Sequence, residues 1–252
     1  ASDSRWSIFR RRGRRFVVGK CEKTIIWRVR SDSIGSENAL VSGAMTRGKF
    51  ITFEGGEGSG KSTQVGLLAE RLRGDGIGTV VTREPGGTPL GEALRALVLD
   101  NAPEPVTELL LFAAARAEHV AKVIRPALAH GTWVVCDRFI HSTRVYQGLL
   151  GGVPTDLIDV IEVRSVAPTY PDLTIVLDLP PETGLKRANA RGELSRFDAE
   201  GADYHRRLQE GFLDIARAEP DRCLVIDADR APAAIAADVW SAVEARLFAG
   251  TR

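Results

Sequence analysis

One short stretch limits the fold of this chain more than any other, the nine residues Gly55-Gly56-Glu57-Gly58-Ser59-Gly60-Lys61-Ser62-Thr63. They satisfy the pattern G-x-x-x-x-G-K-S/T, and they lie between an apolar run at 50–53 and a helical pattern that continues to about Arg73. The glycines let the backbone wind tightly, so that successive N–H groups point inward beside the positive end of the following helix. The stretch therefore predicts a strand, a phosphate-binding loop and a helix in that order, which is the opening unit of an α/β fold.

The loop also predicts how a triphosphate is bound. All nine residues are expected to surround the phosphates of ATP, with Lys61 neutralising the β and γ oxygens and the hydroxyl of Ser62 binding Mg²⁺. A second apolar run, at 133–136, ends in Asp137-Arg138-Phe139. Ligands of α/β sheets bind at the carboxyl ends of strands, so Asp137 can reach the metal through water and Arg138 can project toward a phosphate. A surface salt bridge beside the strand end is the alternative for Arg138.

From Lys49 onward, short apolar runs alternate with helical patterns, which is typical of βαβ units and a parallel sheet. Strands are predicted at 50–53, 79–82, 133–136, 173–179 and 224–226. Helices are predicted at 61–73, 90–99, 106–129, 155–166, 181–190, 202–218 and 232–248, with Pro126 kinking or ending the third. Residues 45–252 are thus expected to form one three-layer α/β domain, in which helices flank a five-stranded parallel sheet.

Residues 1–44 differ from the rest of the chain. They carry ten Lys/Arg against four Asp/Glu, although the net charge of the whole chain is only +1. Met45, the only methionine, stands four residues before Lys49, where an initiator would be expected if the leader were upstream sequence. We expect upstream sequence or a disordered tail here, with a targeting leader or an anion-binding arm as the alternatives.

Composition argues against several other classes of protein. No run approaches the roughly 18 to 20 apolar residues that span a bilayer, and the N-terminus lacks the apolar run of a secretory signal. The three cysteines lie far apart and outside any Cys-x-x-Cys or Cys/His metal spacing, and the four histidines form no ligand pair. We therefore expect a cytoplasmic protein with no disulfide framework, no zinc site, and no nucleic-acid or membrane partner.

The phosphate loop alone does not decide what happens to the phosphoryl group, because GTPases, partition ATPases and metabolic kinases all use it. A GTPase should show an N-K-x-D segment, and the sequence has none. A transport or helicase ATPase should end an apolar strand in Asp-Glu, whereas Asp137 is followed by Arg138. These features favour a kinase that moves the γ-phosphoryl group of ATP to a small acceptor. A nucleotide-dependent switch or binding module is the rival from another class.

Several further segments occur in the order found in thymidylate kinases, and the chain resembles that family across most of residues 49–245. The matching segments are 53–63, Thr82-Arg83-Glu84-Pro85-Gly86-Gly87-Thr88, Leu111-Phe112 with Arg116, Asp137-Arg138-Phe139 with Ser142-Thr143, Tyr146-Gln147-Gly148, and Arg191-Gly192-Glu193-Leu194 with Arg196. The resemblance implies a P-loop kinase fold, phosphorylation of dTMP to dTDP with MgATP, and a homodimer. Another nucleotide or nucleoside kinase of the same class is the closest alternative.

The resemblance implies that the ring of Phe112 stacks on thymine and that Arg116 donates to an exocyclic oxygen of the base. A helix places residues four apart on one face, and stacking of a base on an aromatic ring is worth roughly 1 to 3 kcal/mol. A purely structural role for Phe112 in the core is the alternative.

The remaining contacts to the acceptor are also implied by the resemblance. Arg83 and Arg138 would bind its phosphate, Thr143 and Gln147 would line the base pocket, Tyr146 would crowd the 2′ position of the sugar, and Glu57 would meet the 3′-hydroxyl or the metal shell. No basic residue follows Gly56 within the loop before Lys61, so a catalytic arginine must come from elsewhere.

A mobile lid over ATP, at about 187–200, would supply that arginine as Arg191 or Arg196. Ser195 and Asn189 depart from the family pattern, which leaves open which lid residue matters most. A solvated charged face is the alternative for the lid arginines.

Overall fold

The structure is a computed structural model that describes residues 7–11, 14–21, 24–29, 46–191 and 200–248. The chain divides into two compact units, Ala1–Ala44 and Met45–Arg252. In the first unit β1 (Ser7–Arg11), β2 (Arg14–Cys21) and β3 (Thr24–Val29) form an antiparallel sheet in the order β1-β2-β3. No strands were predicted from the sequence in this segment. The expectation that it is upstream sequence or a tail stays a prediction.

The second unit is built on a five-stranded parallel sheet, which confirms the predicted fold class. Its strands are β4 (Phe50–Glu54), β5 (Thr79–Arg83), β6 (Trp133–Asp137), β7 (Leu173–Asp178) and β8 (Cys223–Asp227). Their order is β5-β6-β4-β7-β8, so the first strand of this unit lies at the centre. The chain adds strands first on one side of β4 and then on the other. Ligands bind at such a switch point, beside the carboxyl end of the central strand.

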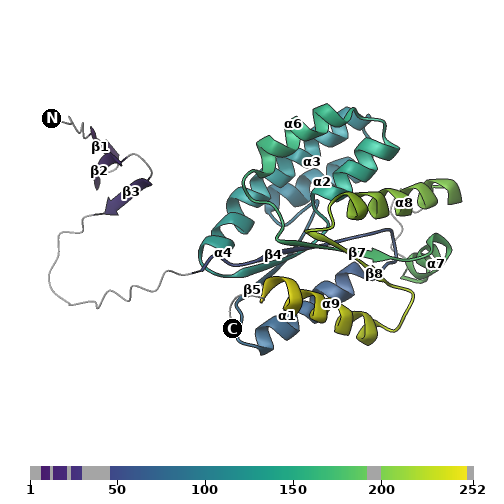
Figure 1. Cartoon of the computed structure of the whole chain (residues 1–252). Helices are drawn as coiled ribbons and strands as arrows, with labels where there is room; N and C mark the ends of the chain where they lie inside the picture. Colours follow the sequence, from purple (N-terminus) through teal and green to yellow (C-terminus); the bar gives the residue numbers. More distant parts are fainter. Residues whose placement is uncertain (1–6, 12–13, 22–23, 30–45, 192–199, 249–252) are drawn as a thin grey trace. The chain divides into compact units, whose positions relative to one another are not determined.

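Helices cover both faces of the sheet (Figure 1). On one face lie α1 (Lys61–Gly74) and α9 (Pro232–Leu247), and on the other lie α2 (Pro89–Asn101), α3 (Pro105–His119), α6 (Thr155–Val166) and α8 (Ala202–Ala218). Helix α7 (Pro181–Arg191) follows β7. Phe50 and Ile51 are both fully buried but belong to different core clusters, because alternate side chains of a strand point to opposite faces. The apolar strands are continuous because both faces are covered.

Pro126 was expected either to kink or to end the long helical segment, and the segment does not end there. After α3 come a π-helical segment, η1 (Val120–Ile124), and a short helix, α4 (Arg125–Ala129). A π-helical turn disrupts the regular bonding ladder, and proline, which has no N–H to donate, is tolerated beside it. The segment therefore ends at Ala129 and not at the proline.

One helical segment was missed by the sequence analysis. Helix α5 (Ile140–Thr143) runs directly into a π-helical segment, η2 (Arg144–Leu150), just after β6. These turns carry several of the predicted site residues. Within the described residues, no helix has both the length and the apolar character needed to cross a bilayer.

Candidate active site

The loop between β4 and α1 encloses the side chain of Lys61. Its Nζ donates to the carbonyl oxygens of Gly55 (3.1 Å) and Gly56 (2.7 Å) and to Ser59 Oγ (3.2 Å). Burial, together with the nearby charge of Arg138, lowers the pKa of Lys61 from 10.5 to about 8. The loop thus encloses the amine of Lys61 among its own hydrogen-bond acceptors.

The loop leaves no room for a side chain at Gly58. Its φ is +67°, and a Cβ added there would lie 2.1 Å from the carbonyl oxygen of Gly184 in α7. Both the backbone conformation and the close approach of α7 therefore require glycine. This contact fixes the loop against the first turn of α7.

Ser62 and Asp137, both predicted from the sequence to serve the metal, meet at the mouth of the loop. Ser62 Oγ donates to Asp137 Oδ2 over 2.7 Å, which joins the start of α1 to the end of β6. A hydroxyl and a carboxylate are the oxygen ligands that Mg²⁺ prefers. The two side chains thus fit the metal role expected of them.

Arg138 links the phosphate loop to a neighbouring pocket. Its Nη1 donates to Gly55 O (3.1 Å), and its Nη2 donates to Glu57 Oε1 (2.9 Å). The hydroxyl of Tyr146 donates to the same carboxylate oxygen over 2.6 Å. Burial alone would raise the pKa of Glu57, but the charges of Arg138 and Lys61 and the bond from Tyr146 lower it to about 2. The ion pair is largely enclosed and joins β6 to the loop, unlike a surface salt bridge at the strand end.

The pocket brings together seven of the residues predicted to bind the acceptor. They are Glu57, Phe112, Arg116, Arg138, Thr143, Tyr146 and Gln147. Its other lining residues are Glu84, Pro85, Arg95, Leu99, Phe139 and Ser142. One of these lining residues, Glu57, belongs to the phosphate loop, so the pocket lies directly beside the place expected for the triphosphate.

Helix α3 supplies the pocket with an aromatic ring and a cation. Phe112 and Arg116 lie one turn apart on the buried face of α3. Arg116 Nε donates to Glu84 Oε2 (2.6 Å), and its Nη2 donates to the carbonyl oxygen of Phe139 (3.1 Å). Within the described part of the chain, Nη1 has no hydrogen-bond acceptor. Gln147, which also lines the pocket, donates from Nε2 to Glu108 Oε1 over 2.6 Å.

Arg83 lies outside this group. Its side chain is 57% exposed and its Nη2 donates to Glu92 Oε2 over 2.9 Å. This bond is the main cause that lowers the pKa of Glu92. Arg83 instead lines an adjacent hollow with Ser62 and Asp137.

The structure adds an arginine that the sequence analysis missed. Arg95 of α2 lines the pocket and donates from Nη1 to Pro85 O over 3.2 Å. Burial, and then repulsion from Arg83, lowers its pKa. Gly91 and Val98 are the buried residues of α2, at spacings that place Arg95 on the same face. A basic residue on the inner face of a predicted amphipathic helix was the signal that could have revealed it.

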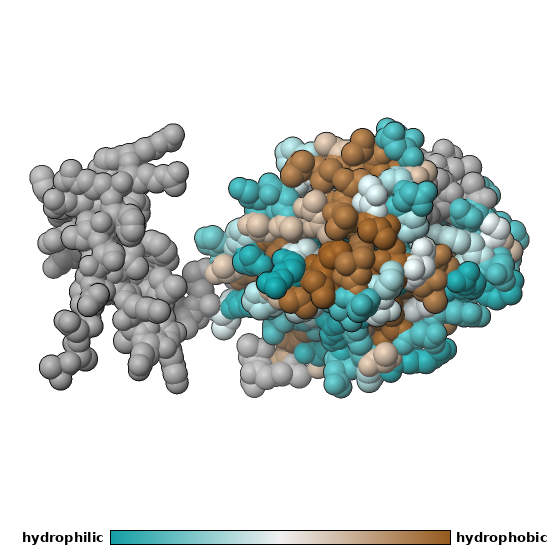
Figure 2. All heavy atoms as spheres, turned by 90° about the horizontal axis from the view of Figure 1, so that it is seen from above, coloured by the Kyte–Doolittle hydropathy of each residue, from teal (hydrophilic) through white to brown (hydrophobic). Residues whose placement is uncertain are grey.

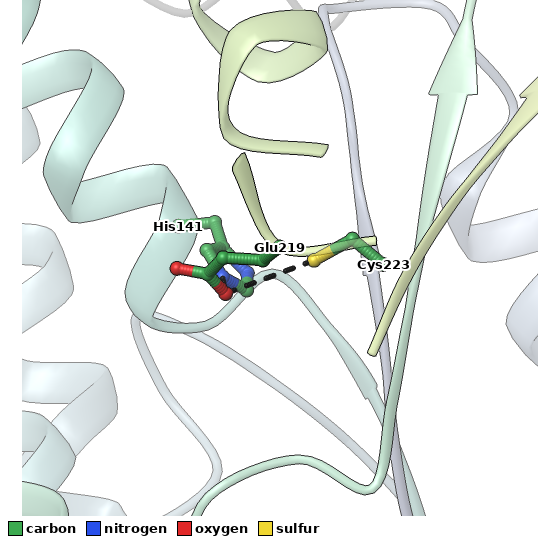
Figure 3. Close-up of side chains that lie close together, drawn as sticks. All are labelled: His141, Glu219 and Cys223. Atoms are coloured by element: carbon green, nitrogen blue, oxygen red, sulfur yellow. Dashed lines mark hydrogen bonds and ion pairs between the residues drawn. The ribbon is translucent and has the colours of Figure 1, made fainter. Parts of the chain in front are cut away.

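A second polar cluster lies outside the pocket (Figure 3). The ligand atoms of His141, Glu219 and Cys223 are all within 4.8 Å of one another, with His141 Nε2 3.2 Å from Glu219 Oε2. However, Arg222 Nε already donates to that oxygen over 2.6 Å, and burial raises the pKa of Cys223 to about 11. We interpret the cluster as an ion-paired network that ties α5 to the turn before β8.

The side-chain positions of the two predicted lid arginines, Arg191 and Arg196, are not described by the structure. Arg191 is the last residue of α7, and the position of its side chain is not described. Arg196 lies in 192–199, outside the described residues.

Comparison with known proteins gives a consistent result. The family model for thymidylate kinase matches residues 53–239. A thymidylate kinase of Caulobacter vibrioides is 53% identical over 206 residues, which cover 81% of this chain and 99% of that protein. One from Rhodopseudomonas palustris is 51% identical over 214 residues, covering 82% and 93%. The crystal structure of thymidylate kinase from Ehrlichia chaffeensis superposes with a TM-score of 0.65 at 37% identity, and the match covers 78% of this chain and 99% of that one.

Proposed function

The chain belongs to the thymidylate kinase family, and from this we propose how its pocket carries out transfer of the γ-phosphoryl group of ATP to dTMP. It is an ATP-dependent nucleoside monophosphate kinase of the transferase class. The products of the reaction are dTDP and ADP.

One observation supports this proposal more than any other, the position of the Arg138 guanidinium. It donates to the carbonyl oxygen of Gly55 in the phosphate loop and also lines the pocket. A phosphate in that pocket would therefore lie next to the phosphates of a triphosphate in the loop. Proximity of this kind is a large part of the catalysis of phosphoryl transfer.

In the proposed reaction an oxygen of the dTMP phosphate attacks the γ-phosphorus of ATP in line with the bond to the β,γ-bridging oxygen. The new P–O bond forms as the bridging bond breaks, and the electron pair leaves with ADP. No protein nucleophile is needed, because the acceptor is already anionic. Lys61 and Arg138 stabilise the charge that spreads over the transferring group, and Arg191 or Arg196 would add to this from the lid.

Recognition of the acceptor is divided between its two ends. At the base, Phe112 would stack on the ring, Arg116 would donate from Nη1, and Thr143 and Gln147 would line the edge. Tyr146, held by Glu57, would crowd the 2′ position of the sugar.

At the phosphate, Arg138 and Arg95 would supply the positive charges. Arg83, implied for the same phosphate by the resemblance, would have to release Glu92 to reach it.

Magnesium is the metal that kinases of this kind generally use. Ser62 and Asp137 would hold it, since their oxygens lie 2.7 Å apart at the mouth of the loop. When bound with ATP, the ion neutralises charge on the β and γ oxygens. Activity should then disappear with excess EDTA and return with added Mg²⁺.

Substrate choice is tested by turnover across nucleoside monophosphates. With ATP and Mg²⁺, the protein should convert dTMP to dTDP with a kcat/KM well above that for dCMP, AMP or GMP. If dTMP were no better than these, the acceptor assignment would be wrong. ATP consumption without a phosphorylated acceptor would instead support a switch or binding module.

We also propose a homodimer that covers an aliphatic surface on α3 and α6. Figure 2 shows hydrophobic side chains gathered on the face that bears these helices. Its exposed members are Val106, Leu110, Leu157, Val160 and Val163. Their spacings of three and four residues place them along one side of each helix. Clustered exposed aliphatic residues favour a protein partner, and a second copy of this chain is the one the resemblance implies.

The cytoplasmic location stays a prediction from the sequence.

A further inference from the structure

Arg116 makes several contacts with the protein besides the one proposed with the base. Its Nε and Nη2 are both engaged, with Glu84 and with the carbonyl oxygen of Phe139. Its guanidinium carbon also lies 5.3 Å from the centre of the Phe139 ring. Only Nη1 then remains to meet a base, so the direction of that donor depends on the residues behind the guanidinium.

The carboxylate of Glu84 is fixed at both oxygens. Oε2 accepts from Arg116, and Oε1 lies 2.9 Å from His119 Nδ1. The side chain is only 4% exposed, and the backbone N–H of Glu84 donates to Asp137 O over 2.9 Å. A buried carboxylate needs both partners, because an unpaired lone-pair site in the interior is costly.

His119 completes the arrangement from α3, one turn after Arg116, with a side chain that is fully buried. A carboxylate can only accept, so Nδ1 carries the proton that bonds Glu84. In the neutral ring Nε2 is then an acceptor, and it lies 2.7 Å from the hydroxyl of Thr82. Because Thr82 can donate, every polar atom of the imidazole has a partner.

The turn at Gly87 lies close to the imidazole of His119. A Cβ added at Gly87, whose φ is +75°, would lie 2.4 Å from His119 Nε2 and 2.7 Å from Thr82 Oγ1. The turn after β5 thus presses against the ring, and a side chain at Gly87 would displace it. A chain of contacts thus runs from Thr82 through His119 and Glu84 to Arg116.

We infer that His119 and Glu84 are positioning residues for base recognition, acting through Arg116. This inference rests on the proposed function, since it assigns the network to the step in which the pyrimidine is bound. The competing interpretation is that the network only joins α3 to β5 and stabilises the fold. A stabilising role would lower the melting temperature without a selective effect on the acceptor.

The two interpretations separate in steady-state kinetics of the full chain. His119→Phe removes both hydrogen bonds, and we expect it to raise KM for dTMP by about tenfold to a hundredfold, the size of one lost charge-assisted bond. The KM for ATP and kcat should stay within about threefold. His119→Asn, whose amide can replace Nδ1–H, should restore most of the affinity. His130→Phe, the same change at an exposed histidine, is the matched control and should behave as wild type.

A double-mutant cycle gives the decisive result. In an Arg116→Ala background, His119→Phe should have no further effect on KM for dTMP, because the group it orients is gone. An equal effect in both backgrounds, or a fall in kcat with unchanged KM, would overturn the inference. Should His119→Phe not fold, Thr82→Val decides the matter. It removes only the outer hydroxyl and should raise KM for dTMP about threefold, and an unchanged KM counts against the inference. If the wild-type protein did not phosphorylate dTMP, the proposed function would be wrong instead.

Discussion

Removal of the Arg138 side chain should damage stability and catalysis for different reasons. Arg138→Met takes three hydrogen bonds from the site, to Gly55 O, Glu57 Oε1 and Ser142 Oγ. It also leaves the enclosed carboxylate of Glu57 without its ion-pair partner, although the charge of Lys61 remains nearby. Breaking a buried ion pair from one side costs about 3 to 5 kcal/mol, and the partial exposure of this pair places the expected loss near the lower limit.

The pKa of Glu57 predicts how the effect of this substitution on stability depends on pH. Burial opposes ionisation, yet Arg138, Lys61 and Tyr146 together bring the pKa from 4.5 to about 2, which corresponds to about 3 kcal/mol. A lowered carboxylate pKa stabilises the folded state fully above 4.5, and this stabilisation disappears as the pH falls toward 2. The difference in free energy of unfolding between wild type and Arg138→Met should therefore be largest at neutral pH and shrink across that range.

Adding Glu57→Gln to Arg138→Met separates the two effects. The double variant no longer buries an uncompensated charge, so denaturant unfolding should show that about half or more of the lost stability returns. Turnover should not return, because the transition state still lacks its guanidinium, and kcat should stay about 10³-fold or more below wild type. Recovery of activity in the double variant would refute the reasoning, since Arg138 would then serve only to neutralise Glu57.

The other predictions concern single parts of the molecule. Phe112→Ala should raise KM for dTMP about tenfold with little change in kcat, as loss of one stacked base predicts, and an unchanged KM would favour a purely structural ring. Arg95→Ala should raise KM for dTMP by about tenfold or more while leaving KM for ATP unchanged, and equal changes in both would place it elsewhere in the mechanism. Val160→Glu, at a site 61% exposed, should turn a dimer into a monomer in light scattering, whereas Glu118→Gln should not. A chain that begins at Met45 should keep full activity, and failure to fold or turn over would contradict the assignment of residues 1–44.

The features that could be predicted from sequence depend on local patterns. Helices α6 and α8 begin and end where their patterns do, and the apolar run at 133–136 became the buried strand β6. Phe112 and Arg116 lie on one face of α3, as the spacing of four residues predicts for a helix. The phosphate loop was recognisable because strand, glycines and helix are contiguous.

The features that were missed depend on contacts between distant residues. Helix α5 starts where Glu54, at the end of β4, accepts from Phe139 N and from Ser142, and no pattern near 140–150 reveals that partner. Arg95 was overlooked because its burial follows from the turn at Pro85, which only the folded chain brings close. Arg83 lies in the expected motif, yet its side chain pairs with Glu92 and does not line the pocket.

The backbone of Arg138 explains why these distant contacts are needed. Its φ of +68° is a left-handed conformation that costs a residue with a side chain about 1 to 2 kcal/mol. That conformation is combined with a guanidinium that reaches the phosphate loop, and glycine, which would adopt it freely, would supply no charge. The carboxylate of Glu54 holds the following turn through Phe139 N (2.8 Å) and Ser142 Oγ (2.6 Å), while Arg138 N donates to Phe53 O (2.9 Å). Strain at the residue that joins the phosphate loop to the neighbouring pocket is thus offset by bonds on either side of it, and those bonds come from the strand that leads into the phosphate loop.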